Sequence, residues 1–145
     1  MEKVLKIDHE KCTGCRLCEL VCAVKHDGIS NPVRSRIRVI KWEAEGVYIP
    51  MSCQQCEDAP CVAACPGKAL ERNDAAGRVE LDYDACIGCR ACMQACPYDA
   101  IYLNEERGAV EKCHFCAHRV EVGLEPACAV VCPENAIISG DLHDP

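Results

Sequence analysis

The sequence is poor in large apolar side chains and contains no long apolar segment. Aromatic residues make up 4 % of its 145 residues, with one Trp and one Phe, and about 39 % of the chain is apolar once its cysteines are set aside. The longest wholly apolar run, Ala127 to Cys132, is far too short to cross a bilayer. Something other than large side chains must therefore fill the interior.

Several function classes are also missing their signatures. The opening residues, Met1 to Asp8, show no apolar export segment and no twin arginine, which predicts a cytoplasmic protein. A formal net charge of −7 excludes a basic nucleic-acid-binding face and favours protein partners. The chain has neither a Walker loop nor a G-x-G-x-x-G, so no nucleotide site is indicated.

Cysteine is what the sequence has in abundance, with 16 residues in four groups of four. An even number admits disulfide bonds, zinc sites or iron–sulfur clusters. Disulfide bonds need an oxidising compartment, which no export signal predicts. The groups are Cys12, Cys15, Cys18 and Cys22; Cys53, Cys56, Cys61 and Cys65; Cys86, Cys89, Cys92 and Cys96; and Cys113, Cys116, Cys128 and Cys132.

The spacing separates iron–sulfur clusters from zinc. The third group is C-x2-C-x2-C-x3-C followed by Pro97, the run typical of bacterial ferredoxins. Three closely spaced cysteines wrap one cubane, and Gly14 and Gly88 let the loop curl close to it. The fourth cysteine follows about one helical turn later and is available to a neighbouring cluster. A zinc-binding structural protein, the alternative of a different class, would instead show paired CxxC knuckles with nothing left over.

This logic predicts crossed ligand sets. Each cluster takes three cysteines from one group and the last cysteine of its partner group. The alternative, in which each group binds its own cluster, uses the same 16 metal ligands in a different fold. The crossed sets are Cys12, Cys15, Cys18 and Cys132 for cluster 1; Cys113, Cys116, Cys128 and Cys22 for cluster 2; Cys53, Cys56, Cys61 and Cys96 for cluster 3; and Cys86, Cys89, Cys92 and Cys65 for cluster 4.

The four groups form an internal repeat of strand, cluster loop, helix and strand. We therefore predict an α+β fold of tandem dicluster ferredoxin-like units, built around clusters in one compact domain, 1–145. The inner unit covers about residues 47–103. The outer unit is discontinuous and covers about residues 1–46 plus 104–145. Residues 73–77 read as a hairpin turn between the second and third groups.

The cysteine pattern resembles the four-cluster subunits of molybdenum and tungsten oxidoreductases, among them those of dimethyl sulfoxide reductase and polysulfide reductase. The resemblance rests on the second group, C-x2-C-x4-C-x3-C-P, and the split fourth group, C-x2-C-x11-C-x3-C-P, and runs from Cys12 to Leu142. The stretches 18–23 and 31–37, with His26, are similar to short soluble members that accompany tungsten aldehyde oxidoreductases or carbon monoxide dehydrogenase.

This resemblance implies the cofactors and partners. Some relatives replace a group-three cysteine and hold a three-iron cluster, but all four are present here, which implies four 4Fe–4S clusters. The implied function is relay of single electrons between a catalytic tungsten or molybdenum subunit and a second redox protein. A freely diffusing polyferredoxin, or a partner of carbon monoxide dehydrogenase, formate dehydrogenase or hydrogenase, is the alternative. Larger members have a long tail where this sequence stops, so a membrane anchor subunit is not the expected dock.

With every thiol assigned to a closed cluster, no thiol and no open metal position is left for catalysis, so we predict an electron-transfer subunit without a catalytic site. A few other residues carry smaller predictions. His26 is expected to face solvent from a loop, with a hydrogen bond to a cluster sulfur as the alternative, and His114 and His118 are not expected to be ligands. Alternating Arg34, Arg36 and Arg38 predict a strand with one basic face, used for docking or solvated at a sheet edge, and nearby Trp42 is expected to be buried.

Overall fold

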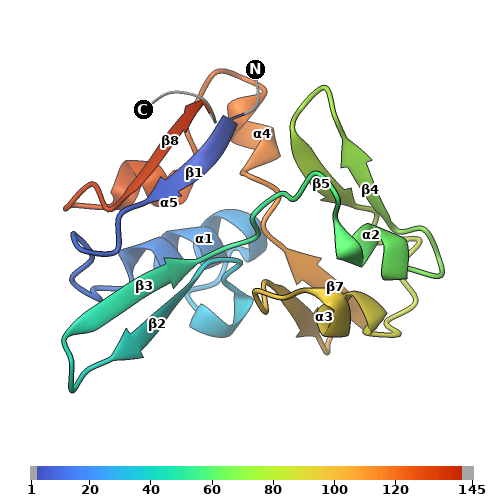
Figure 1. The fold of residues 1–145 in the computed structure, drawn as a ribbon, viewed down its shortest axis with the longest axis horizontal. Helices are drawn as coiled ribbons and strands as arrows, with labels where there is room; N and C mark the ends of the chain where they lie inside the picture. Colours follow the sequence, from blue (N-terminus) through green and yellow to red (C-terminus); the bar gives the residue numbers. More distant parts are fainter. Residues whose placement is uncertain (1–2, 142–145) are drawn as a thin grey trace.

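The computed structural model describes residues 3–141 as four two-stranded antiparallel sheets with short helices between them (Figure 1). Met1 and Glu2 of the opening segment, and Leu142 where the resemblance ends, lie outside the described residues. The elements are β1 (Lys3–Ile7), α1 (Leu17–Asp27), the 3-10 helix η1 (Pro32–Arg34), β2 (Arg38–Trp42), β3 (Val47–Met51), α2 (Pro60–Ala64), β4 (Leu70–Asn73), β5 (Arg78–Leu81), α3 (Ala91–Ala95), β6 (Ile101–Asn104), β7 (Ala109–Lys112), α4 (Ala117–Val120), α5 (Ala127–Val131) and β8 (Ile137–Asp141).

The pairing of β1 with β8 joins the two ends of the chain. These strands are antiparallel, with Ile7 opposite Ile137, whereas the other three sheets are hairpins of consecutive strands. In Figure 1 the β1–β8 sheet lies with α1 and α5 on one side of the molecule, while β4, β5, α2 and α3 lie on the other. The α+β ferredoxin-like fold is thus confirmed, with segments from both ends of the chain in one half.

Each half of the molecule has its own cluster of buried apolar side chains. One gathers residues 56–110 around Val79 and Ile101, and the other gathers residues from both ends of the chain, with Ile37 and Ile137. Tyr48 packs on the outer cluster and Val110 belongs to the inner one. The division into two units stays a proposal. Boundaries after β3 and after β7 would keep the hairpins β2–β3 and β6–β7 whole.

Most helices are single turns that end at a cysteine. Helices α2, α3 and α5 have five residues each and are followed by Cys65, Cys96 and Cys132, each with a proline next, which stops the helix. Group one has Ala23 instead of that proline, so α1 runs on for eleven residues and ends at Gly28 in the left-handed conformation. Among residues 3–141, no helix is both long enough and apolar enough to cross a membrane.

The predicted turn at residues 73–77 is confirmed, whereas the predicted basic strand is wrong. Asn73 Oδ1 accepts a hydrogen bond from the Ala76 amide, and Gly77 has a φ of 69°. Instead of a strand, Asn31 caps η1 and Pro32 begins it, because its fixed φ suits a first helical residue. Arg36 is 3 % exposed and forms ion pairs with Asp27 and Glu111, so it presents no docking face.

The other two arginines of the predicted basic strand also contact groups within the molecule, and the nearby tryptophan is more exposed than predicted. Arg34 pairs with Glu106 at 2.8 Å, and the Arg38 guanidinium lies 3.7 Å from the centre of the Tyr102 ring. Trp42 is 47 % exposed, so the expected burial is wrong. It sits at the end of β2, in a hairpin that extends away from the rest of the molecule in Figure 1.

Candidate metal centres

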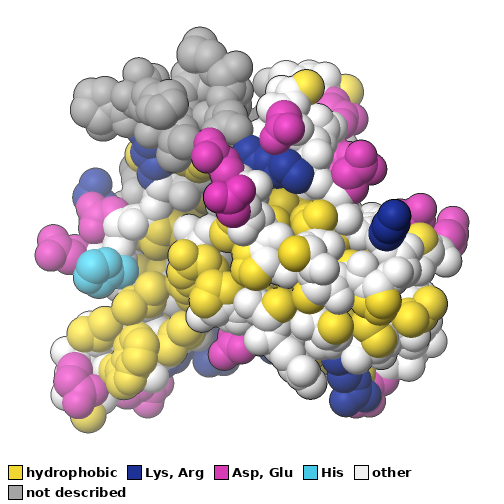
Figure 2. Space-filling model, turned by 45° about the vertical axis from the view of Figure 1, so that its right-hand side comes forward, with side chains coloured by type: hydrophobic (Ala, Val, Ile, Leu, Met, Phe, Trp, Pro, Cys, Tyr) yellow, Lys and Arg dark blue, Asp and Glu magenta, His cyan; other side chains and the backbone are white. Residues whose placement is uncertain are grey.

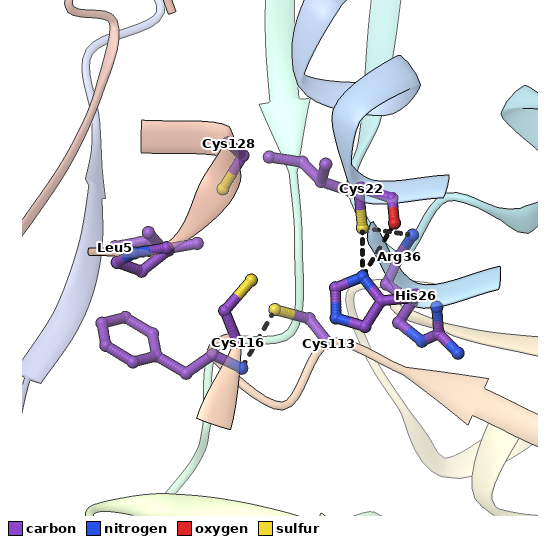
Figure 3. Close-up of a pocket in the computed structure, with 10 residues that line it drawn as sticks. Leu5, Cys22, His26, Arg36, Cys113, Cys116 and Cys128 are labelled. Atoms are coloured by element: carbon purple, nitrogen blue, oxygen red, sulfur yellow. Dashed lines mark hydrogen bonds between the residues drawn. The ribbon is translucent and has the colours of Figure 1, made fainter. Parts of the chain in front are cut away.

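Four small cavities are each lined by four cysteines. Figure 3 shows one of them, in which the labelled cysteines approach a common space from α1, α5 and the segment after β7. We number the cavities as sites 1 to 4. Site 1 has Cys12, Cys15, Cys18 and Cys132; site 2 has Cys22, Cys113, Cys116 and Cys128; site 3 has Cys53, Cys56, Cys61 and Cys96; site 4 has Cys65, Cys86, Cys89 and Cys92.

Short helices distribute these cysteines between neighbouring sites. Cys18 and Cys22 lie four residues apart on α1 and line different cavities, as do Cys128 within α5 and Cys132 just after it. Helices α2 and α3 divide their cysteines between sites 3 and 4 in the same way. This geometry is consistent with crossed ligand sets, and the assignment of ligands to clusters stays a prediction.

The loops of sites 1 and 4 need glycine. Gly14 and Gly88 have φ values of 74° and 73°, a region that favours glycine. A Cβ on Gly14 would lie 2.7 Å from Cδ1 of Tyr48, and one on Gly88 would overlap the Gly108 carbonyl oxygen. Sites 2 and 3 place Phe115 and Gln55 at the equivalent loop position, also with positive φ. The four sites therefore fall into two loop types.

Backbone amides donate to cysteine sulfurs in every site. The Arg36 amide lies 3.3 Å from Cys22 Sγ, and the amides of Gln55 and Phe115 each lie 3.4 Å from the sulfur two residues earlier. Ala69 and Ala136 donate to Cys65 and Cys132 at 3.3 Å. Such bonds stabilise negative charge on sulfur and are one of the levers that set cluster potentials.

Without a positive charge beside them, these buried thiols favour the protonated form. Burial raises the pKa of Cys18 to about 12 and that of Cys113 to about 12, and nearby cysteines add to both shifts. Burial also raises the pKa of Cys92 to about 11. Thiolates at such positions require a strong positive charge at the centre of the cavity, which iron supplies. The donor set and the amide bonds therefore fit an iron–sulfur cluster in each site.

Exposure differs between the sites. All 16 cysteines lie within the described residues, and only Cys15 and Cys89 are exposed. These belong to sites 1 and 4. Sites 2 and 3 contain only buried or half-buried cysteines.

The sequence predicted that His26 faces solvent from a loop, and this prediction is wrong. Because α1 continues past Cys22, His26 is half-buried on that helix. Its Nδ1 lies 2.8 Å from the carbonyl oxygen of Cys22 and 3.6 Å from Cys22 Sγ. The proline missing after Cys22 was the signal that could have shown this.

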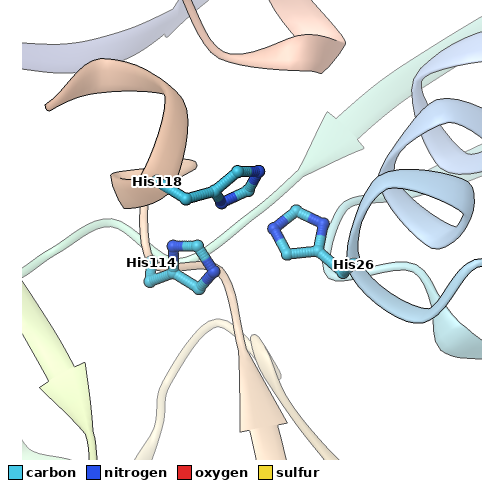
Figure 4. A group of neighbouring side chains, drawn as sticks. All are labelled: His26, His114 and His118. Atoms are coloured by element: carbon cyan, nitrogen blue, oxygen red, sulfur yellow. The ribbon is translucent and has the colours of Figure 1, made fainter. Parts of the chain in front are cut away.

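His26, His114 and His118 come together from three segments (Figure 4). Their ring centres are 4.9 to 5.8 Å apart, and one ligand atom from each could lie within 4.8 Å of the others. However, His114 Nδ1 accepts a hydrogen bond from the Ala117 amide at 2.9 Å, which puts the proton of the neutral ring on Nε2. Coordination through Nε2 would cost that bond. The three imidazoles pack together beside site 2. Our prediction that neither His114 nor His118 is a metal ligand stays a prediction.

Comparison with known proteins places the sequence in a family. Residues 44–142 match the 4Fe–4S dicluster domain, and residues 5–22 match a 4Fe–4S binding domain. The protein belongs to the 4Fe–4S dicluster family. Its cofactors are accordingly four 4Fe–4S clusters, for which the 16 cysteines supply four ligands each.

Relatives within the dicluster family are subunits of reductase complexes. A polyferredoxin-like subunit of the aliphatic sulfonate oxidoreductase of Pyrococcus furiosus is 41 % identical over 88 % of this chain and 70 % of its own length. One polypeptide of the anaerobic dimethyl sulfoxide reductase of Escherichia coli is 38 % identical over 95 % of this chain and 73 % of its own length. The protein therefore belongs with the iron–sulfur subunits of the dimethyl sulfoxide and polysulfide reductases.

Coverage and fold similarity complete the comparison. The chain spans between 58 % and 77 % of the lengths of several curated relatives that it matches. The fold is similar to a chain of the BamBC active-site complex of benzoyl coenzyme A reductase, with a TM-score of 0.56, 24 % identity, and coverage of 95 % of this chain and 78 % of that one.

Proposed function

We propose that the chain relays single electrons between a catalytic molybdenum or tungsten subunit, of the aldehyde oxidoreductase kind, and a second redox protein. Bound 4Fe–4S clusters would supply the one-electron carriage. The residues of this chain hold the clusters in crossed ligand sets and set the surroundings of each. The observation that carries the proposal is the continuous series of four cysteine-lined cavities with an exposed cysteine at each end.

The series has a definite order. Sites 1 and 2 share helices α1 and α5, and sites 3 and 4 share α2 and α3. Between sites 2 and 3, the Gln55 side-chain amide donates to the carbonyl oxygen of Cys113 at 2.8 Å. The order 1, 2, 3, 4 therefore spans the molecule from one half to the other, which suits a relay and serves no purpose in a zinc-stabilised adaptor.

Both ends of the series lie beside exposed apolar side chains. Ile87, in the loop of site 4, is 70 % exposed, and Leu17, in the lining of site 1, is 37 % exposed. Figure 2 shows apolar side chains collected across one face, with acidic side chains around its edges. Such surfaces next to an exposed cluster cysteine favour docking of a partner at each end.

The nature of the partner rests on the relatives. Those named above are an aliphatic sulfonate oxidoreductase subunit and a dimethyl sulfoxide reductase polypeptide, both of which belong to larger oxidoreductases. A freely diffusing polyferredoxin is the alternative, favoured by the net charge of −7, which suits reversible electrostatic docking.

Metal analysis of the protein purified without air from its native host tests the proposal. We expect about 16 iron atoms per chain, four for each cubane, together with stoichiometric molybdenum or tungsten. Iron alone, in a protein that elutes as a monomer, would favour the free carrier. Stoichiometric zinc with little iron would overturn the electron-relay function altogether.

A further inference from the structure

We propose that Lys112 acts as a buried cation shared by the clusters of sites 2 and 3, raising the reduction potentials of these two clusters and not those of sites 1 and 4. The inference rests on the ligand sets of the proposed function. It assigns a specific task to a lysine that has no part in holding iron.

Lys112 is at the end of β7, immediately before Cys113, and is 2 % exposed. Its Nζ donates to the carbonyl oxygen of Cys113 at 2.8 Å and to Gln55 Oε1 at 3.4 Å. Gln55 also accepts a hydrogen bond from the Val79 amide on the same oxygen and donates through Nε2 to Cys113. The lysine is thus held in one place by groups from both halves of the molecule.

Both hydrogen-bond partners of the ammonium group are neutral oxygens. The carboxylates that line the neighbouring surface cavity, Glu80 and Glu121, are occupied by Arg78, at 2.9 and 2.7 Å. Among residues 4–140, whose side chains the structure describes, no carboxylate forms a salt bridge with Lys112. A buried ammonium without a counter-ion is costly, so an anion is expected nearby. Cysteine-ligated iron–sulfur clusters are anions of this kind.

Lys112 lies beside the cluster loops of both central sites. Gln55, which accepts its hydrogen bond, stands between Cys53 and Cys56 of site 3. Cys113, whose carbonyl oxygen accepts the other, is itself a cysteine of site 2. A cation that stabilises added negative charge at two sites favours the reduced state of both, because in a poorly solvated interior its field is weakly screened.

Lys11 provides a matched control. It also stands immediately before the first cysteine of a group, Cys12 of site 1. Its side chain, however, is 58 % exposed and pairs with Asp8 at 3.6 Å. Water and the carboxylate screen this charge, so removing it should leave all potentials nearly unchanged.

The experiment is an anaerobic redox titration, followed by electron paramagnetic resonance, of the four-cluster protein and of Lys112→Met, Lys112→Arg and Lys11→Met. In Lys112→Met we expect two of the four midpoint potentials to fall, each by at least a tenfold change in the reduction equilibrium, about 59 mV for one electron. Lys112→Arg, which keeps the charge, and Lys11→Met should reproduce the wild-type potentials.

Other results would overturn the assignment. If Lys112→Met keeps its iron and shifts no potential, shifts all four together, or shifts them no more than Lys11→Met does, the lysine has only a packing role. Such a result would leave the electron relay standing, whereas a wild-type protein without iron–sulfur signals would remove the relay itself.

A second variant covers the case in which Lys112→Met fails to assemble its clusters. Gln55→Glu places a carboxylate on the ammonium and cancels its charge without deleting it. We expect the same two potentials to fall in this variant. Unchanged potentials in a Gln55→Glu protein with full iron content would contradict the proposal.

Discussion

The two terminal sites, 1 and 4, differ from the two central sites, 2 and 3, although each of the four is lined by four cysteines. The terminal sites use glycine loops at Gly14 and Gly88 and each contain an exposed cysteine. The central sites use Gln55 and Phe115 at the equivalent loop position and contain no exposed cysteine among the 16 described. One ligand chemistry is therefore more exposed to solvent at the ends than in the middle.

This difference separates two tasks. Water screens charges around a terminal site, so its potential depends little on any single residue and it remains accessible to a partner. In the middle, fixed groups such as Lys112 and Arg36 act over short distances with little screening. Variants that break this contrast should show large, localised effects at central positions and smaller ones at the ends.

The largest effect is expected from pairs of cysteine substitutions that separate crossed from self-contained ligand sets. With crossed sets, Cys22→Ala together with Cys116→Ala removes two ligands of one central cluster and alters that cluster alone. Cys18→Ala together with Cys22→Ala alters two clusters, one terminal and one central. Iron content and the number of spins in the fully reduced protein would distinguish one altered cluster from two.

Self-contained groups predict the opposite pattern, which makes the test decisive. The inner half provides an independent repeat with Cys65→Ala and Cys89→Ala, both from site 4, against Cys61→Ala and Cys65→Ala, from sites 3 and 4. If the pairs taken from one helix turn altered one cluster, and the pairs taken from one cavity altered two, the crossed assignment would be wrong in both halves.

The next effect concerns the buried ion pairs around one arginine. Arg36 lies beside site 2 and reaches Glu111 on β7 at 3.4 Å and Asp27 at 3.5 Å. Arg36→Met leaves both carboxylates buried, with Arg107 as their remaining cationic partner and Asn104 still donating to Glu111. We expect the free energy of unfolding to fall by about 3 kcal/mol, the low end for breaking a buried pair, measured from denaturation midpoints without air.

Glu106→Gln is the control for that variant. It removes the Arg34–Glu106 pair, in which the Glu106 side chain is 82 % exposed. Exposed pairs contribute little, so the expected loss is below about 0.5 kcal/mol. Equal losses in the two variants would show that burial at the centre adds nothing to these interactions.

The sequence predicts the local features well and the long-range ones poorly. The hairpin turn at residues 73–77 and the helix ends before Pro66, Pro97 and Pro133 depend on neighbouring residues, and the structure has them. Arg36, interpreted from the sequence as part of an exposed basic strand, is buried and paired with Asp27 and Glu111. Glu111 lies far along the chain on β7, so this contact depends on tertiary packing.

Lys112 and Gln55 were missed for the same reason. Fifty-seven positions separate the two residues that share the central hydrogen bonds. One signal was present, since the second and fourth groups have Gln55 and Phe115 where the first and third have glycine. That replacement marks the central sites in the sequence itself, but the identity of the residue that Gln55 would contact could only come from tertiary packing.

Apart from the control variants, the smallest effect is expected at a terminal loop. Gly88→Ala combines a left-handed backbone with an overlap between the new Cβ and the Gly108 carbonyl oxygen, and we expect it to cost about 2 kcal/mol. Gly28→Ala has the same backbone conformation with no atom within 4 Å, so it should cost only about 1 kcal/mol. Iron release to a chelator in mild denaturant would report the damage. Because site 4 alone is affected, Gly88→Ala should release about four iron atoms early and retain the rest, whereas simultaneous release of all its iron would mean that terminal and central sites unfold as one unit.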